Sequence, residues 1–536
     1  MIKASPEFRQ AYAKAPMPQP ESGFEAPPRA VSRRVRLVRR GVVVSYLGWA
    51  VSALSGLVLV PLFVRFLGPR LYGQWLLIVS LLAYLGMGNF GAWQAIPNRI
   101  GQALATGKRN ELASVVATAF WSYVVLTLFV AAAAGGALLF GFGSHLMSRG
   151  GRGFLEALIL SGVLFLAAFP LRVFTVVLRG LERVDIEQLI AVFTGLFRTV
   201  GIAAVLFAGL KLVGVATVHG ISLVAAGLAA YLAVGRVAPE ASARPARFSV
   251  RLLKDLVRPS AAFFALDLSA LVGTATSNIV IAYFIGATAV TRYSVPMRML
   301  LILAGALAVA PSAVRPSLTI QYERRDLRVL QPAFFLSMRL AAVCATAAVI
   351  ALWIGGHALI RLWAGAGIFP GAWVFGLQLA FFFILVLLFP CYTVLMAATR
   401  HYGYATASLI EAFAGFALSV WWVNRFGLAG VIAGAVCARL LTTGWYMPLA
   451  TAAVLGLSGE EMMRELQPLL LYVVPALCVL PLAVAAGGRR DVGSIWVAAL
   501  AASAYALAFV FVAFDGEERY RLWRLLTARA GREALV

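Results

Sequence analysis

The chain has 536 residues, of which 62% are hydrophobic and only 13% are charged. This composition excludes an ordinary soluble globular protein and is typical of a chain that crosses a membrane many times. The net charge of +24 invites a role in binding nucleic acid, but the positions of the basic residues favour a different explanation, membrane orientation.

The apolar stretches predict about fourteen transmembrane helices, because a hydrocarbon core about 30 Å thick requires about 20 apolar residues per helix. Short hinges at 210–212 and 425–427 would make tight hairpins. We therefore expect an all-α polytopic membrane protein. The predicted spans are 41–64, 72–96, 113–141, 154–178, 188–209, 213–234, 259–286, 293–314, 333–355, 372–397, 403–424, 428–452, 468–487 and 494–514.

The first 40 residues predict a disordered, basic cytoplasmic leader, because they are rich in proline and contain no apolar core of a signal peptide. With the N-terminus in the cytoplasm, 31 of the 46 Lys and Arg residues fall in cytoplasmic segments and 10 in outer loops. This asymmetry follows the positive-inside rule. It places both termini in the cytoplasm, including a basic tail at 515–536, and leaves nucleic acid out of the expected partners.

Two sequence landmarks recur at a nearly constant offset and indicate an internal repeat. RFLGPRLYGQW (65–75) is echoed by YFIGATAVTRYSV (283–295), and GKRNEL (107–112) is echoed by YERRDL (322–327). We predict two six-helix lobes at 41–234 and 259–452, joined by a cytoplasmic linker at 235–258 and followed by two further helices within 453–514. An even number of helices per lobe gives parallel repeats about a pseudo-two-fold axis along the membrane normal, and substrate sites of transporters lie between such repeats.

Five arginines fall inside the predicted spans, where an uncompensated charge costs about 2.5–3.5 kcal/mol at mid-bilayer. Arg298 opens the second helix of the second lobe and is the best candidate for binding an anion. Arg198 is near mid-span, and Arg439 is expected to pair with Glu411 as a structural salt bridge or to take part in ion coupling. The remaining two, Arg172 and Arg339, lie near span ends and can extend to the interface.

Polar side chains recur at helical spacing and predict a cavity lined by the first two helices of each lobe. The seventh span contributes Asp267 and Asn278, while small residues on the same faces also fit close helix packing. In the first lobe, the candidate cavity residues are Ser45, Trp49, Asn89, Trp93 and Gln94. The two tryptophans also suit the membrane interface or simple packing.

The sequence predicts no cofactor and no metal. The four cysteines and four histidines are scattered without the spacing of a zinc site. There is no GxxxxGK[ST] motif, which argues against direct use of ATP. Coupling to H⁺ or Na⁺ would require an ionisable group in a span, for which Asp267 and Glu411 are the candidates.

Several segments together resemble the bacterial polysaccharide-transporter flippases of the multidrug/oligosaccharidyl-lipid/polysaccharide exporter superfamily. The resemblance rests on 65–96, on RGLERVDIEQLIAVFTGLFRTVG (179–201), on FIGATAVTRYSVPMRM (284–299) and on NRFGLAGVIAGAVCARLL (424–441). It implies a two-lobed helical fold that alternates between inward-open and outward-open states, with arginines in a central cavity. Members often carry Asp at the position of Asn89, so this chain departs from the pattern there.

The resemblance implies a flippase for polyprenyl-pyrophosphate-linked oligosaccharide in the bacterial inner membrane, working in surface or exopolysaccharide biosynthesis. Its expected partners are this lipid-linked substrate, membrane lipids, and a polymerase or glycosyltransferases of the same pathway. A multidrug/cation antiporter of the same superfamily is the alternative, although arginines outnumber acids inside the spans. A membrane enzyme is disfavoured because the longest loop, about 24 residues around 235–258, is too short for a domain.

Overall fold

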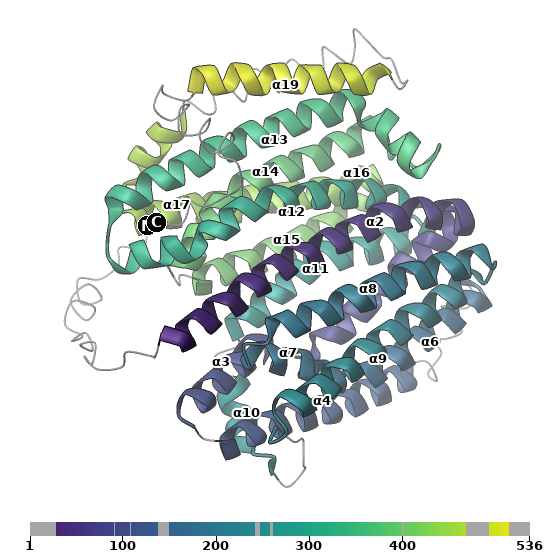
Figure 1. Cartoon of the computed structure of the whole chain (residues 1–536). Coiled ribbons are helices and arrows are strands. Elements are labelled where there is room, and N and C mark those ends of the chain that lie inside the picture. Colours follow the sequence, from purple (N-terminus) through teal and green to yellow (C-terminus); the bar gives the residue numbers. More distant parts are fainter. Residues whose placement is uncertain are drawn as a thin grey trace.

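The computed structural model describes residues 28–89, 92–107, 109–137, 150–241, 247–257, 261–398, 401–467 and 493–513. Within these ranges the regular elements are all helices (Figure 1). The helices before residue 240 are α2 (Pro28–Leu85), η1 (Gly86–Asn89), α3 (Ala92–Ala105), α4 (Arg109–Ala137), α6 (Arg152–Ala168), η3 (Pro170–Arg172), α7 (Val173–Gly180), α8 (Val184–Phe207) and α9 (Lys211–Val237).

A short helix, α10 (Val250–Val257), separates this first bundle from a second one. The helices of the second bundle are α11 (Ala261–Phe284), α12 (Ala287–Glu323), α13 (Leu327–Ala364), α14 (Ala372–Ala397), α15 (His401–Phe426), α16 (Leu428–Leu441) and α17 (Thr443–Leu455), and α19 (Gly493–Ala513) lies along α13. The two bundles meet where α2 packs against α11 and α12.

The chain is a multi-pass membrane protein. Among the described residues, ten helices are long and apolar enough to cross a membrane, or eleven if the bent pair of α6 with η3 and α7 is one span. The count treats Ala50–Leu85 as one span, although Gly68 divides it into the first two predicted spans. The thirteenth predicted span lies outside the described residues. The all-helical polytopic fold is thus confirmed, while the number fourteen is not.

Three predicted spans are interrupted where we expected continuous helices. In the second, α2 ends at Leu85 and is followed by the 3-10 helix η1 and then by α3, because Gly86 and Gly88 weaken the α-helix. The fourth bends by 42° at Pro170, which cannot donate the backbone hydrogen bond. The twelfth divides at Thr442 into α16 and α17. By contrast, α2 begins earlier than the first predicted span. It starts at Pro28 and so includes the last residues of the leader that we expected to be disordered.

The turns of the two repeated landmarks have the same backbone conformation. Gly68 has φ 75° and ψ 167°, and Gly286 has φ 119° and ψ 168°. This region of φ and ψ is open essentially to glycine alone. Each glycine reverses the chain between two long helices, and both turns lie at the same end of the molecule, hereafter the Gly68 end (Figure 1). The shared geometry supports the predicted duplication.

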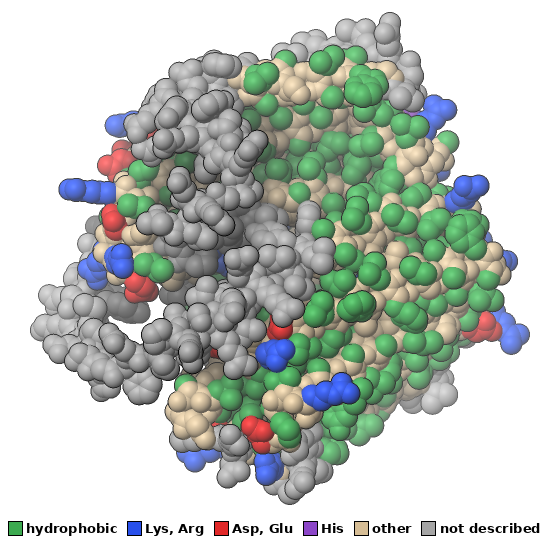
Figure 2. Space-filling view, viewed as in Figure 1, with side chains coloured by type: hydrophobic (Ala, Val, Ile, Leu, Met, Phe, Trp, Pro, Cys, Tyr) green, Lys and Arg blue, Asp and Glu red, His purple; other side chains and the backbone are tan. Residues whose placement is uncertain are grey.

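The surface has an apolar band between two charged ends (Figure 2). On α8 the exposed residues Phe193, Val200 and Phe207 have exposed fractions of 67%, 67% and 69%. Such a contiguous apolar surface is unfavourable in water, whereas lipid tails satisfy it. Lys, Arg, Asp and Glu gather toward the helix ends in the same view. This distribution agrees with helices that span a bilayer.

Candidate functional site

Two arginines from different bundles lie on helices that pack against α2, Arg298 on α12 and Arg198 on α8. Arg298 is exposed, and its guanidinium packs against the backbone of Gly56, where an added Cβ would be 3.2 Å from Nη2. Arg198 is within electrostatic range of Arg298, so the two positive charges repel one another. Gly56 therefore provides the space on α2 in which the Arg298 head group lies.

Further polar groups from the first bundle surround the pair. The hydroxyl of buried Tyr72 lies beside the Arg298 guanidinium. His219 on α9 lies near Arg198 and contacts the edge of Trp75, with 5.3 Å between the ring centroids. We refer to Arg198 and Arg298 as the cationic centre, beside which His219 is a partly buried, uncharged neighbour.

Within the part of the chain that the structure describes, neither Arg198 nor Arg298 forms an ion pair with Asp or Glu. Two like charges held together without a counterion are costly in a low-dielectric environment. A bound anion would relieve that repulsion, and the exposed guanidinium of Arg298 can donate hydrogen bonds to it. The arrangement therefore suits a ligand with at least two negatively charged oxygens.

Among the residues whose side chains are described, hydrogen bonds at several points along α2 join it to the second bundle. Thr291 Oγ1 donates to the carbonyl oxygen of Pro69 at 2.7 Å, and Trp363 Nε1 donates to that of Leu57 at 2.8 Å. Asn278 Nδ2 donates to Ser80 Oγ at 3.0 Å. Another joins the hydroxyl groups of Tyr84 and Thr276.

Asn278 therefore serves the contact between the bundles in this structure. Its Oδ1 also accepts a hydrogen bond from Ser294 Oγ at 2.7 Å, so both ends of the amide have partners. The polar residues predicted in the seventh span, now part of α11, therefore serve different roles. Asp267 and Thr274 line a cavity instead.

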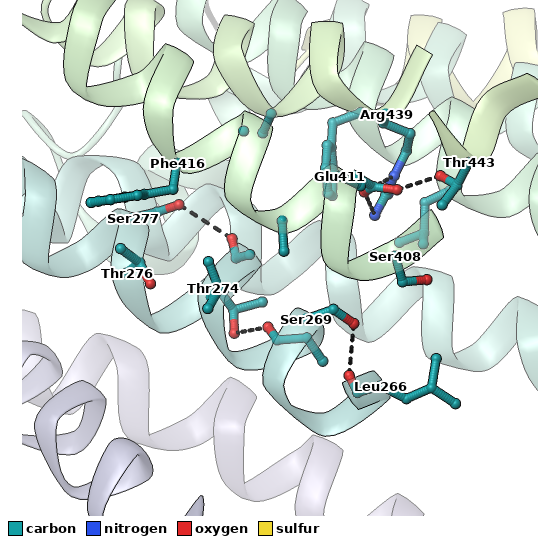
Figure 3. Close-up of a pocket in the computed structure, with 18 of the residues that line it drawn as sticks. Leu266, Ser269, Thr274, Thr276, Ser277, Ser408, Glu411, Phe416, Arg439 and Thr443 are labelled. Atoms are coloured by element: carbon teal, nitrogen blue, oxygen red, sulfur yellow. Dashed lines mark hydrogen bonds and ion pairs between the residues drawn. The ribbon is translucent and has the colours of Figure 1, made fainter. Parts of the chain in front are cut away.

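That cavity lies inside the second bundle and has a volume of about 470 Å³. Its walls come from α11, α12, α14, α15, α16 and α17. Figure 3 shows Ser269, Thr274 and Ser277 of α11 along one side, facing Ser408 and Glu411 of α15 and Arg439 of α16 on the other. We call it the second-bundle cavity.

Glu411 and Arg439 form the expected ion pair in its wall. Arg439 Nη2 lies 2.7 Å and Nε 2.8 Å from Glu411 Oε1, and the Thr443 hydroxyl donates to Oε2 (Figure 3). The Arg439 guanidinium also stacks over the Phe381 ring, with 4.3 Å to its centroid. Both carboxylate oxygens of Glu411 are thus used within the protein, which leaves Asp267 as the carboxylate open to the cavity.

Five predicted site residues lie at positions whose side chains the structure does not describe. Their backbones belong to α2, η1 and α3, so they remain predictions: Ser45, Trp49, Asn89, Trp93 and Gln94. Conversely, the sequence reasoning missed Tyr72 and His219. A single histidine and a single tyrosine carry no spacing signal, and only the packing of α2 against α8, α9 and α12 brings them to the arginines.

Comparison with known proteins agrees with this architecture. Among solved structures, the chain is similar to the lipid II flippase MurJ in an inward closed conformation, with a TM-score of 0.63 and 12% identity over 91% of this chain and 99% of that one. It is also similar to an inward-facing multidrug resistance MATE family transporter of the MOP superfamily, with a TM-score of 0.59 and 16% identity over 77% and 98% of the two chains.

At these identities the likeness shows a shared fold alone. A comparison with curated proteins gives no match. Residues 38–319, more than half of the chain, match the sequence profile of a family described as polysaccharide biosynthesis proteins. Together with the helical bundles described above, this match confirms the resemblance seen in the sequence: the chain belongs to the polysaccharide biosynthesis protein family.

Proposed function

We propose that the protein is a flippase that moves polyprenyl-pyrophosphate-linked oligosaccharide across the bacterial inner membrane by alternating access. The observation that carries the proposal is the cationic centre, in which Arg198 and Arg298 lie on helices packed against α2 and form no ion pair with an acidic residue among the described residues. A pyrophosphate offers two linked anionic groups, and the planar fork of arginine suits phosphate oxygens better than an ammonium group does.

The apolar band and the cationic centre together match the two parts of this substrate. A polyprenyl chain remains in lipid beside the apolar surface (Figure 2), while the charged head group requires a polar passage between the bundles. Contacts of α2 with α11 and α12 join the bundles, including the bond from Thr291 to Pro69 near the Gly68 end. Passage of the head group would require these contacts to break and re-form.

The positive-inside pattern supports cytoplasmic termini, with the Gly68 end facing outward. For ion coupling, Asp267 is the stronger candidate, since Arg439 and Thr443 occupy both oxygens of Glu411. A cation would have to displace Arg439 to bind Glu411. The pathway neighbours we propose are glycosyltransferases that build the lipid-linked oligosaccharide and a polymerase that consumes it.

A multidrug/cation antiporter is the alternative, since a MATE transporter shares the fold. The cationic centre argues against it, because Arg198 and Arg298 would repel a cationic drug. Cells that express the protein would resist cationic dyes under the antiporter hypothesis and would show no change under ours.

The proposal is tested by replacing Arg298 and measuring flipping directly. Purified protein in liposomes would receive a fluorescent polyprenyl-pyrophosphate-linked oligosaccharide, and quenching from outside would report its translocation. We expect Arg298→Ala to reduce the rate by about 10- to 150-fold, since a charge-assisted contact to phosphate contributes roughly 1.5–3 kcal/mol. Arg298→Lys should recover part of the rate, because it restores the charge without the fork.

Arg425→Ala is the matched control, because Arg425 is exposed at the end of α15, away from the cationic centre. It should flip at the unaltered rate. Equal rates for Arg298→Ala and the unaltered protein would rule out the role we assign to Arg298. A complete lack of flipping by the unaltered protein would rule out the proposed function.

A further inference from the structure

The second-bundle cavity is a long compartment beside the cationic centre. Its wall on α11 runs from Leu266 to Val280, which corresponds to about 21 Å along a helix. The volume of about 470 Å³ lies within the usual range for small-molecule sites. The cavity is partly open to its surroundings, and Asp267, Ala270 and Thr274 in its wall are exposed, so a ligand can enter it.

One wall of the cavity presents hydrogen-bond acceptors. The hydroxyls of Ser269, Thr274 and Ser277 donate to main-chain carbonyls of Leu266, Ala270 and Gly273, at 2.8, 2.8 and 3.2 Å (Figure 3). Each hydroxyl proton is thereby used within α11, and the oxygens of Ser269 and Thr274 keep lone pairs that can accept. The oxygen of Ser277 also interacts with the hydroxyl of Tyr293. Asp267 adds a carboxylate on the same helix. Such a wall is complementary to a ligand with many donor groups, such as the hydroxyls of a sugar.

The opposite walls are aromatic. Phe381, Phe389 and Tyr392 of α14 and Tyr404 and Phe416 of α15 line the cavity. Tyr392 and Tyr404 pack edge to face, with 5.6 Å between ring centroids. Aromatic side chains provide rigid apolar surface, and tyrosine adds a polar tip. A sugar ring has apolar C–H faces and polar edges, so it matches this combination better than an ion or a simple hydrocarbon does.

The cavity also adjoins the cationic centre. Leu301 of α12 lines the cavity, and Arg298 lies three residues earlier on the same helix. Residues at this spacing are neighbours on one helix face, and both are exposed. A group held by Arg298 therefore lies about one helical turn from the cavity wall.

We propose that the second-bundle cavity is a glycan subsite that holds the sugars nearest to the pyrophosphate while the cationic centre holds the pyrophosphate itself. The inference rests on the proposed flippase function and adds how the head group is recognised. The Glu411–Arg439 pair cancels its own charge, so Asp267 leaves the cavity with a net negative charge. The subsite therefore favours neutral or amino sugars over uronic acids.

The test compares lipids with and without sugar on purified full-length protein in nanodiscs. The probes are undecaprenyl pyrophosphate and the same lipid bearing glucose-, galactose- or N-acetylglucosamine-based disaccharides. We expect at least one disaccharide lipid to bind about tenfold more tightly than the bare lipid. Ala270→Trp fills the cavity from an exposed position in its wall. It should reduce that preference to below about threefold and leave affinity for the bare lipid unchanged.

Two further variants keep the test decisive. Ala417→Trp is the matched control, since Ala417 is exposed on α15 and does not line the cavity; it should keep the full preference. Thr274→Val removes one acceptor with almost no change of shape, and should weaken disaccharide binding alone by about fivefold.

The subsite is ruled out by three results: no disaccharide lipid binds better than the bare lipid, Ala270→Trp keeps the preference, or Ala270→Trp weakens the bare lipid equally. The last would identify the cavity as a site for the lipid tail. If the unaltered protein binds none of the pyrophosphate lipids, the proposed function itself fails.

Discussion

The Glu411–Arg439 ion pair has short contacts, but one nitrogen of the guanidinium has no hydrogen-bond partner. The two side chains are only 15% and 16% exposed. Arg439 contributes two nitrogens to the carboxylate and stacks on Phe381, while its Nη1 has no hydrogen-bond partner. The pair also lies beside Thr442, where the helix is interrupted between α16 and α17. It therefore ties α15 to both halves of the twelfth span.

Replacing one partner of this pair should lower the stability of the protein more than replacing both. Arg439→Met leaves a half-buried carboxylate with only the Thr443 hydroxyl, and breaking a buried ion pair costs about 3–5 kcal/mol. We expect a clear decrease in the thermal-unfolding midpoint in detergent. The double variant Arg439→Met with Glu411→Leu should recover much of that loss. A single variant as stable as the unaltered protein would contradict a structural role for the pair.

At the residue scale, charge inside an apolar span was the informative signal. It predicted the partner of Arg439, because a charge in a span needs a partner or a ligand, and the role of Arg298 stays a prediction. Hydroxyl and amide residues were harder to assign. Asn278 shares a face with Asp267 in the sequence pattern, yet it bonds Ser80 and Ser294, since only the packing decides which polar group meets a neighbouring helix.

At the element scale, the apolar length of each span was predictable and its continuity was not. The predicted span at 372–397 coincides with α14, and the turn at Gly68 was expected from its sequence. The break at Thr442 had no such signal, because a window of hydropathy averages over a single residue and no proline or glycine occupies that position. Pro170 did mark a bend, but it lies inside an apolar run that otherwise reads as one helix.

A close approach between the bundles at Gly73 gives a prediction for α2 and α12. A Cβ added at Gly73 would lie 1.8 Å from the carbonyl oxygen of Ala287, so the two helices must separate to accept it. We expect Gly73→Ala to shift the protein toward a state open at the Gly68 end. Spin labels at Arg70→Cys and Arg292→Cys, in a background without the native cysteines, should report a longer distance by pulsed electron resonance.

Gly195→Ala provides the comparison, because an added Cβ there has no atom within 4 Å. It makes the same chemical change in α8, including the usual gain of up to about 1 kcal/mol in helix propensity. Its label distances should equal those of the parent. Unchanged distances in Gly73→Ala would show that the α2–α12 contact does not set the state of the protein.

For the molecule as a whole, the asymmetry of basic residues predicts its orientation. With 31 Lys and Arg residues on one side and 10 on the other, the side that carries both termini should be cytoplasmic. Green fluorescent protein fused after Val536 should fluoresce, and alkaline phosphatase fused after Arg425 should be active because that position faces outward. The opposite pattern of activities would show that both termini face outward, and it would contradict the proposed direction of transport.

The matched turns at Gly68 and Gly286 restrict where chain can be added to this architecture. Each reverses direction through one backbone conformation reserved for glycine, and the tips of the two hairpins touch through Thr291 and Pro69. Extra residues there would separate those tips. At the opposite end, the chain between the bundles already accommodates α10, which packs against α3 and α4. Affinity tags, antibody epitopes and fluorescent inserts therefore belong in the segment around α10.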